Sequence, residues 1–243
     1  MYLWKTIWPF GLSVLYPLRF EVPWWETVPA AGILVTISAF VLLRASKHPY
    51  AFMGWLWYLG TLVPVIGIVQ FGSHSMADRY TYIPHIGLFI AICWTARSVF
   101  DRLAWGRTML QLATILPLFL YSVRTWHHLP AWRDGESLFS QAVAVTKSNF
   151  IAHNNLAAAL VQKGKLREAQ KQLQTVIRIR PEYDRGWLNL IRVLIRQGRS
   201  DEASLVCSQG KVHFPNHPTI SRLCDMIAPP KMRTTVIAPS NSQ

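Results

Sequence analysis

The sequence predicts an all-α protein in which several transmembrane helices are followed by a superhelix of short helical repeats. Two observations lead to this fold class. Four apolar runs follow one another within the first 123 residues, each close to the roughly 20 residues that a helix needs to cross a bilayer. The second half of the chain is more polar, and its pattern of apolar residues and glycines recurs every 34 residues.

Residues 1–27 are predicted to lie on the membrane surface rather than to cross it. Prolines at positions 9, 17 and 23 interrupt any long helix, and tryptophans in this segment favour the headgroup layer. Lys5 is a candidate for contact with a lipid phosphate, although a lysine beside a membrane also extends to water for solvation alone. The segment lacks the basic end, apolar core and cleavage site of a signal peptide.

Residues 28–123 are predicted to form four transmembrane helices, over 28–43, 50–71, 82–96 and 108–123. Aromatic residues flank these runs, and an arginine follows three of them, at Arg44, Arg97 and Arg124. The alternative for each run is a buried helix of a soluble protein. Four runs in series with aromatic flanks and cationic ends favour the membrane.

Positive charge in the short loops predicts the orientation of these helices. The loops Arg44–Pro49 and Arg97–Arg107 are rich in cations and are expected on the cytoplasmic side. The loop around Asp78 carries one arginine balanced by one aspartate, so we expect it outside, together with everything after Arg124.

The soluble part contains two cysteines, Cys207 and Cys224. They either form a disulfide in that compartment or stay as buried thiols.

The second half repeats with the period of the tetratricopeptide unit. Aligning Pro181 with Pro215 gives 34 residues, with glycines where paired helices turn and small residues where they approach. The predicted division is a linker with a half-repeat helix over 124–147, repeats over 148–181 and 182–215, and a capping helix with a disordered tail over 216–243.

Stacked repeats of this kind offer a concave face for a protein or peptide partner. We expect that face to carry one polar, one apolar and three basic residues, which are Asn154, Leu188, Arg185, Arg192 and Arg196. Arginines one turn apart suit a carboxylate or phosphate. A solvated basic face is the alternative.

The connection over 71–87 gathers polar residues between two apolar runs. Arg79, Tyr80 and Tyr82 are candidates for binding a lipid phosphate at the headgroup layer. Asp78 either orients Arg79 or acts as a base, and the alternative is a helix-capping aspartate beside an interfacial arginine. His74 and His85 lack a third partner, so no metal site is expected.

The net charge of +13 raises the possibility of nucleic-acid binding. That function needs a basic face on a recognisable nucleic-acid module, and the sequence contains none. Basic loops beside a membrane explain the same charge, so membrane lipid rather than nucleic acid is the expected partner.

The motif ADRYTYIPHIGLF, preceded by GIVQFGSHSM and followed by tetratricopeptide repeats, resembles a group of bacterial membrane proteins. These combine a multispanning region of the GT-C glycosyltransferase type with extracytoplasmic repeats. The chain is also similar to the transmembrane and tetratricopeptide repeat-containing protein O-mannosyltransferases of eukaryotes. The resemblance implies a bacterial inner-membrane protein with periplasmic repeats that uses a polyprenyl-phosphate sugar donor and no resident cofactor.

The resemblance also implies a catalytic acidic residue in the first extracytoplasmic loop of a longer chain. The acidic residues before position 124 are Glu21, Glu26, Asp78 and Asp101, and none sits in a matching motif. We therefore assign no catalytic residue and expect the C-terminal part of such a glycosyltransferase, inactive alone. The alternatives are a membrane-anchored scaffold for protein–protein interaction and a fragment without independent activity.

Overall fold

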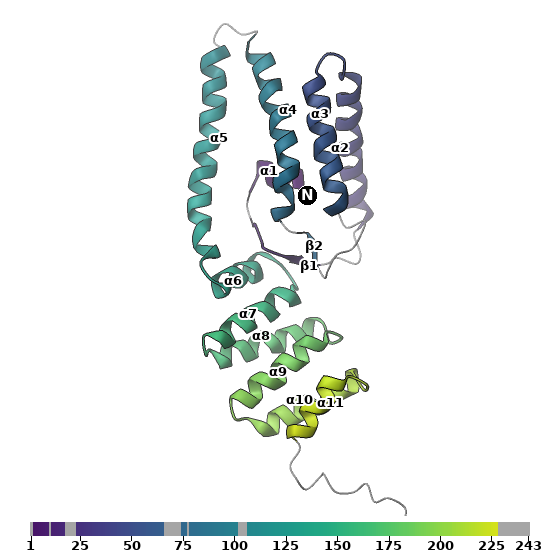
Figure 1. Cartoon of the computed structure of the whole chain (residues 1–243), viewed down its shortest axis with the longest axis vertical. Coiled ribbons are helices and arrows are strands. Elements are labelled where there is room, and N and C mark those ends of the chain that lie inside the picture. The colour runs from purple at the N-terminus through teal and green to yellow at the C-terminus, as the bar shows by residue number, and fades with distance from the viewer. Residues whose placement is uncertain are drawn as a thin grey trace, which may run out of the picture. The chain divides into compact units, whose positions relative to one another are not determined.

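The computed structural model describes residues 2–9, 11–17, 23–65, 74–76, 78–101 and 106–227 (Figure 1). Contacts divide the chain into two compact units, residues 1–147 and 148–243. Helices make up nearly all of the regular structure in both, which confirms the predicted all-α class. The exception is a short antiparallel pair in the first unit, β1 (Tyr16–Pro17) with β2 (His74–Met76).

The first unit begins with a short helix and continues with longer ones. Its elements are α1 (Tyr2–Ile7), α2 (Trp24–Leu43), α3 (Pro49–Leu62) with the 3-10 turn η1 (Val63–Val65), η2 (Asp78–Thr81), α4 (Tyr82–Phe100), α5 (Gly106–His128), η3 (Leu129–Trp132) and α6 (Gly135–Val145). Pro9 follows α1 and limits it to less than two turns. Asp134 caps the N-terminus of α6, because its carboxylate accepts a hydrogen bond from the Ser137 N–H at 2.8 Å.

Two of the described helices, α2 and α4, are long and apolar enough to cross a membrane. Four such helices were predicted. α3 has 14 residues, about 21 Å of helix, which is short of the roughly 30 Å hydrocarbon layer. The end of the predicted span 50–71 lies outside the described residues. α5 has 23 residues but is less apolar, since it extends past Arg124 into His127 and His128.

The helices α3 and α4 approach each other closely at small residues. A Cβ added at Gly54 would lie 2.4 Å from the Gly87 carbonyl oxygen and 2.8 Å from the Ala91 Cβ. A Cβ added at Gly87 would lie 2.7 Å from the Gly54 carbonyl oxygen. Because glycine has no Cβ at these two positions, the backbones of α3 and α4 can approach this closely. The indole N–H of Trp55 donates to the Ser38 hydroxyl at 3.0 Å and so joins α3 to α2.

Five consecutive helices make up the part of the second unit that the structure describes, up to residue 227. They are α7 (Phe150–Gln162), α8 (Leu166–Ile179), α9 (Asp184–Arg196), α10 (Ser200–His213) and α11 (Pro218–Ile227), and each packs against the next (Figure 1). The turns after α7 and α9 hold Gly164 and Gly198 at φ +76° and +74°, the left-handed region that glycine tolerates best. The tail after residue 227 was predicted to be disordered and lies outside the described residues.

One buried cluster of this unit forms between α9, α10 and α11. Trp187 and Ile191 of α9 pack with Cys207 of α10 and with Ile220 of α11. Leu188, expected on the concave face, is only 8% exposed and belongs to this cluster. Leu188 follows Trp187 on the helix side that faces α10 and α11, so its apolar side chain is covered.

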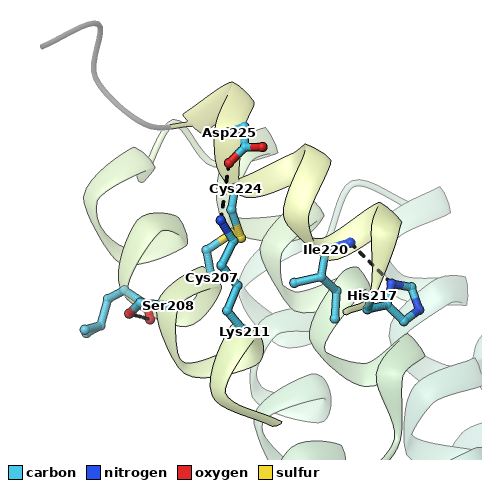
Figure 2. Close-up of a disulfide and its surroundings, with 8 residues drawn as sticks. Cys207, Ser208, Lys211, His217, Ile220, Cys224 and Asp225 are labelled. Carbon is cyan, nitrogen blue, oxygen red and sulfur yellow. Dashed lines mark hydrogen bonds and ion pairs between the residues drawn. A yellow bond between two sulfur atoms is a disulfide. The ribbon is translucent and has the colours of Figure 1, made fainter. Parts of the chain in front are cut away.

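A disulfide joins α10 to α11. Cys207 and Cys224 are bonded, with their Cα atoms 5.5 Å apart (Figure 2). The sequence alone left their pairing open. Beside the disulfide, the Lys211 ammonium lies 3.2 Å from the Asp225 carboxylate and links the same two helices (Figure 2). The last helix is therefore held to the stack by a covalent bond and an ion pair as well as by packing.

Candidate functional site

The first unit contains a cavity of about 360 Å³ where α1 meets α4 and α5. Two of the residues predicted to contact lipid, Lys5 and Tyr82, line it. The full lining is Lys5, Thr6, Pro9, Leu12, Ser13, Thr81, Tyr82, His85, Tyr121, Arg124, Thr125, His128, Leu129 and Trp132. The fold thus brings the N-terminal segment together with the start of α4 and the end of α5.

Hydrogen bonds from α4 and α5 hold α1 and the residues after it at this place. The Tyr121 hydroxyl of α5 donates to the Thr6 carbonyl oxygen at 2.7 Å. The Thr6 hydroxyl lies 2.7 Å from Nε2 of His85 in α4. Nε of Arg124 donates to the Pro9 carbonyl oxygen at 3.3 Å. Both walls of the cavity therefore depend on a six-residue helix that local sequence alone would barely stabilise.

Lys5 is fixed by the chain that follows it. Its ammonium donates to the Gly11 carbonyl oxygen at 3.0 Å and to the Tyr16 hydroxyl at 2.6 Å, and it lies 4.6 Å from the centre of the Tyr16 ring. The Ser13 N–H also donates to the Tyr16 hydroxyl, at 2.9 Å. Tyr16 is buried, so this network gives the ammonium a defined position at the cavity wall.

The charge of the described cavity wall is positive. Lys5 and Arg124 are cations, His85 and His128 add imidazoles, and none of the lining residues that the structure describes is acidic. Hydroxyl groups of Ser13 and Thr81 add further polar atoms. Cations and hydroxyls without a competing carboxylate favour an anion of the size of a phosphate group.

A second, apolar groove of about 550 Å³ adjoins the cavity along α5. Pro9, Tyr121 and Arg124 line both. The remaining lining of the groove is apolar except for one histidine, and consists of Ile7, Trp8, Leu116, Pro117, Leu120, Val123 and His127. A ligand with a charged head and a hydrocarbon chain would therefore find both environments on the two sides of Arg124.

The other predicted lipid-contact residues lie next to the cavity in sequence. Asp78 and Arg79 are in η2, directly before α4, and their side chains lie outside the described part of the structure. Tyr80 is half-buried. The missed residues are Tyr121, Arg124 and His128, whose spacing of three and four places them on one face of α5. That spacing was visible in the sequence, but Arg124 was interpreted only as the end of a span.

From the sequence, His85 was assessed only for metal binding, and no metal site was expected there. Among the described residues, no group of three His, Cys, Asp or Glu side chains is placed to hold a metal ion. His85 instead contacts the Thr6 hydroxyl and lies beside Phe89, with the ring centres 5.5 Å apart and the rings tilted by 53°. Its place in the structure is in the wall of the cationic cavity.

In the second unit, α9 presents the three predicted arginines to solvent. Arg185, Arg192 and Arg196 are exposed. Asn154 of α7 is 7% exposed and accepts a hydrogen bond from Nδ2 of Asn189 in α9 at 2.9 Å. It therefore joins two helices below the surface, while the arginines remain available for contact.

Comparisons with known proteins match the repeats and extend over a larger part of the chain. A family model, "Tetratricopeptide repeat", matches residues 160–227. Protein O-mannosyl-transferase Tmtc3 of Drosophila melanogaster is 27% identical over 192 residues, which cover 78% of this chain and 20% of that protein. Tmtc2 of the same organism is 28% identical over 56% of this chain and 14% of its own length. TMTC1 of Mus musculus is 24% identical over 75% of this chain and 20% of its own length.

This chain is similar to the protein O-mannosyl-transferases with tetratricopeptide repeats. The resemblance predicted from the sequence is thereby confirmed. The chain spans about a fifth or less of the length of these relatives. Among solved structures, the second TPR domain of human RPAP3 in complex with an HSP70 peptide overlaps 38% of this chain at 17% identity, with a TM-score of 0.36 that supports no inference.

Proposed function

We propose that this chain is the membrane and repeat portion of a protein glycosyltransferase that uses a polyprenyl-phosphate sugar, and that the cavity beside Lys5 holds the carrier phosphate. One observation carries the proposal: Arg124 lies in the wall of both a cationic cavity and an apolar groove. A polyprenyl phosphate has the same two parts in the same order. The similarity to protein O-mannosyl-transferases supports this class of ligand.

The chemistry assigned to the cavity is stabilisation of a leaving group. In transfer from a polyprenyl-phosphate sugar, the acceptor oxygen forms a bond to the sugar anomeric carbon and loses its proton to a base. The bond between that carbon and the phosphate oxygen breaks, and the phosphate oxygen keeps the electron pair. Cations already in place, such as Lys5 and Arg124, stabilise the negative charge as it develops. The described lining holds no carboxylate that would deprotonate an acceptor, so we assign the cavity to carrier binding and assign no catalytic base.

We further propose that the first unit crosses the membrane several times and that the repeats lie outside the cytoplasm, in the periplasm if the protein is bacterial. Large apolar side chains are exposed along α2, α4 and α5, which suits contact with lipid. The Cys207–Cys224 disulfide supports the location of the repeats, because disulfides persist mainly in oxidising compartments.

The test measures binding of undecaprenyl phosphate to the full chain in zwitterionic lipid nanodiscs, by native mass spectrometry. We expect Arg124→Gln to weaken binding about tenfold or more, because one charge-assisted hydrogen bond contributes roughly 1.5–3 kcal/mol. The control is Arg222→Gln in α11, which should change nothing. Undecaprenol, which lacks the phosphate, should bind much more weakly. Equal binding of undecaprenol and its phosphate would contradict the proposal.

A second candidate function is a membrane-anchored scaffold whose repeats bind a protein. The exposed arginines of α9 favour it, since they provide a charged surface that the membrane unit does not need. The two functions are compatible, because the repeats of a glycosyltransferase can present an acceptor protein. A chain that binds a protein partner but no polyprenyl phosphate would leave only the scaffold.

A further inference from the structure

The helix α9 carries a row of basic side chains on one side. Arg185, Arg192 and Arg196 are separated by seven and four residues, a spacing that aligns them along a helix. All three are exposed, and the half-buried Asn189 lies in the same row. The opposite side of the helix is buried in the repeat core, through Trp187, Leu190, Ile191 and Leu194. The row is therefore a fixed surface of a well-packed helix.

This arginine row is not neutralised within the described repeats. Arg192 and Arg196 make no hydrogen bond or ion pair with any described residue, and Arg185 interacts with Tyr183. Residues 148–227 contain twelve lysines and arginines but six acidic residues. Four of those six are engaged elsewhere, in the pairs Glu182 with Arg180, Glu202 with Arg199, Asp225 with Lys211 and Asp184 with His217.

The surface beside the row is polar but uncharged. Three positions on α7 lie 34 residues, one repeat, before Asn189, Arg192 and Arg196. They are, in the same order, Asn155, Ala158 and Gln162. Ala158 and Gln162 are exposed and Asn155 is half-buried. The hydrogen bond from Asn189 to Asn154 holds α9 against α7 at this level. A chain lying on α9 would thus meet cations on one side and neutral, small or amide side chains on the other.

We infer that the α9 row binds an extended acidic segment of a protein partner. Arg192 and Arg196 are about 6 Å apart along the helix axis, and Arg185 and Arg192 about 10.5 Å. In an extended chain, residues two apart are separated by about 6.6 Å and residues three apart by about 10 Å. For a segment that runs from Arg196 to Arg185, the matching acidic residues are its first, third and sixth. The inference rests on the proposed role of the repeats in binding a protein.

The experiment uses the full chain in zwitterionic nanodiscs and a fluorescein-labelled peptide, Glu-Ser-Glu-Ser-Ser-Glu between neutral flanks, followed by fluorescence anisotropy. The comparison peptide has glutamine in place of each glutamate. We expect the acidic peptide to bind and the double variant Arg192→Gln/Arg196→Gln to weaken it at least about fivefold. The matched control is Arg167→Gln/Arg178→Gln, which removes the same charge from exposed positions on α8 and should change the affinity less than about twofold.

Three results would overturn the inference: equal binding of the glutamine peptide, equal loss in the two double variants, or tighter binding of a twelve-residue thymidine oligonucleotide than of the acidic peptide. Circular dichroism of each variant verifies that the helices are intact. Undecaprenyl phosphate binding is measured on the same samples. If the chain binds the lipid but not the acidic peptide, only the inference about the α9 row is contradicted. If it binds the acidic peptide but not the lipid, only the proposed lipid site is contradicted.

Discussion

Thr6 and His85 are 79 residues apart in the sequence, yet the Thr6 hydroxyl lies 2.7 Å from Nε2 of His85. This contact joins α1 to α4 at the wall of the cationic cavity. The cavity therefore depends on a long-range contact made by a very short helix.

Thr6→Val should weaken both the fold around α1 and the binding of undecaprenyl phosphate. The valine keeps the shape of the side chain but leaves Nε2 of His85 without this partner, at a cost of about 1–3 kcal/mol. Thermal unfolding in detergent and lipid binding in nanodiscs measure the two effects. The control is Thr36→Val in α2, whose hydroxyl donates only to the Gly32 carbonyl within its own helix. Equal behaviour of the two variants would show that the α1–α4 contact has no role.

Gly54→Ala should destabilise the pair formed by α3 and α4. The added Cβ would lie 2.4 Å from the Gly87 carbonyl oxygen, a backbone atom that cannot move without shifting α4. Forced separation of packed helices costs roughly 1–3 kcal/mol. Gly60→Ala is the matched control in the same helix, because nothing lies within 4 Å of its Cβ position, and alanine there should be neutral or stabilising. The unfolding temperatures of the two variants should differ in opposite directions from that of the natural chain.

Reduction of the Cys207–Cys224 disulfide should destabilise the C-terminal end of the repeats. The two cysteines are 17 residues apart, and closing a loop of this length stabilises a protein by about 3 kcal/mol. Dithiothreitol should lower the unfolding temperature of the natural chain and of Cys93→Ser alike, since Cys93 is a free thiol in α4. It should have no effect on a variant with serine at both 207 and 224. An unchanged unfolding temperature after reduction would contradict the role of the disulfide.

Alkaline pH should destabilise the repeats through Tyr183. Burial is the largest influence on the Tyr183 hydroxyl and raises its pKa above the ordinary value of 10.0. The charge of Arg185 lowers the pKa, the charge of Asp184 raises it, and a hydrogen bond from Arg185 lowers it, but the pKa stays raised. A raised pKa in the folded state means that folding favours the neutral form. The contribution of neutral Tyr183 to the free energy of unfolding is complete below pH 10. It is lost as the pH rises from 10 through the pKa of Tyr183 in the folded state. Tyr183→Phe should lose less stability than the natural chain between pH 9 and 11, in urea unfolding followed by circular dichroism.

Cysteine labelling should show on which side of the membrane each loop lies. In a Cys93→Ser background, an impermeant maleimide added to intact spheroplasts should label Ser75→Cys and should not label Arg102→Cys until the membrane is opened. Position 102 lies outside the described residues, so this expectation comes from the distribution of positive charge in the loops. Labelling of position 102 in intact spheroplasts would reverse the proposed orientation.

The sequence alone sufficed to predict the helical class, the 34-residue period and the similarity to protein O-mannosyl-transferases. These features follow from local patterns: apolar runs, glycines at turns such as Gly164, and the spacing of small residues within one unit. It also identified Lys5 and Tyr82 as candidates, because cations and aromatic residues beside apolar runs are typical of membrane interfaces. Of the four predicted spans, two are matched by described helices that are long and apolar enough to cross a membrane, α2 and α4.

Which of these residues share a site depends on the three-dimensional fold. Lys5, His85 and Arg124 come from three helices far apart in sequence, and their cavity exists because α1 folds back between α4 and α5. The burial of Leu188 and the pairing of Cys207 with Cys224 were likewise decided by how α11 packs on α9 and α10. Periodicity shows which side of a helix is apolar, but the neighbour that covers it is chosen by contacts between distant segments.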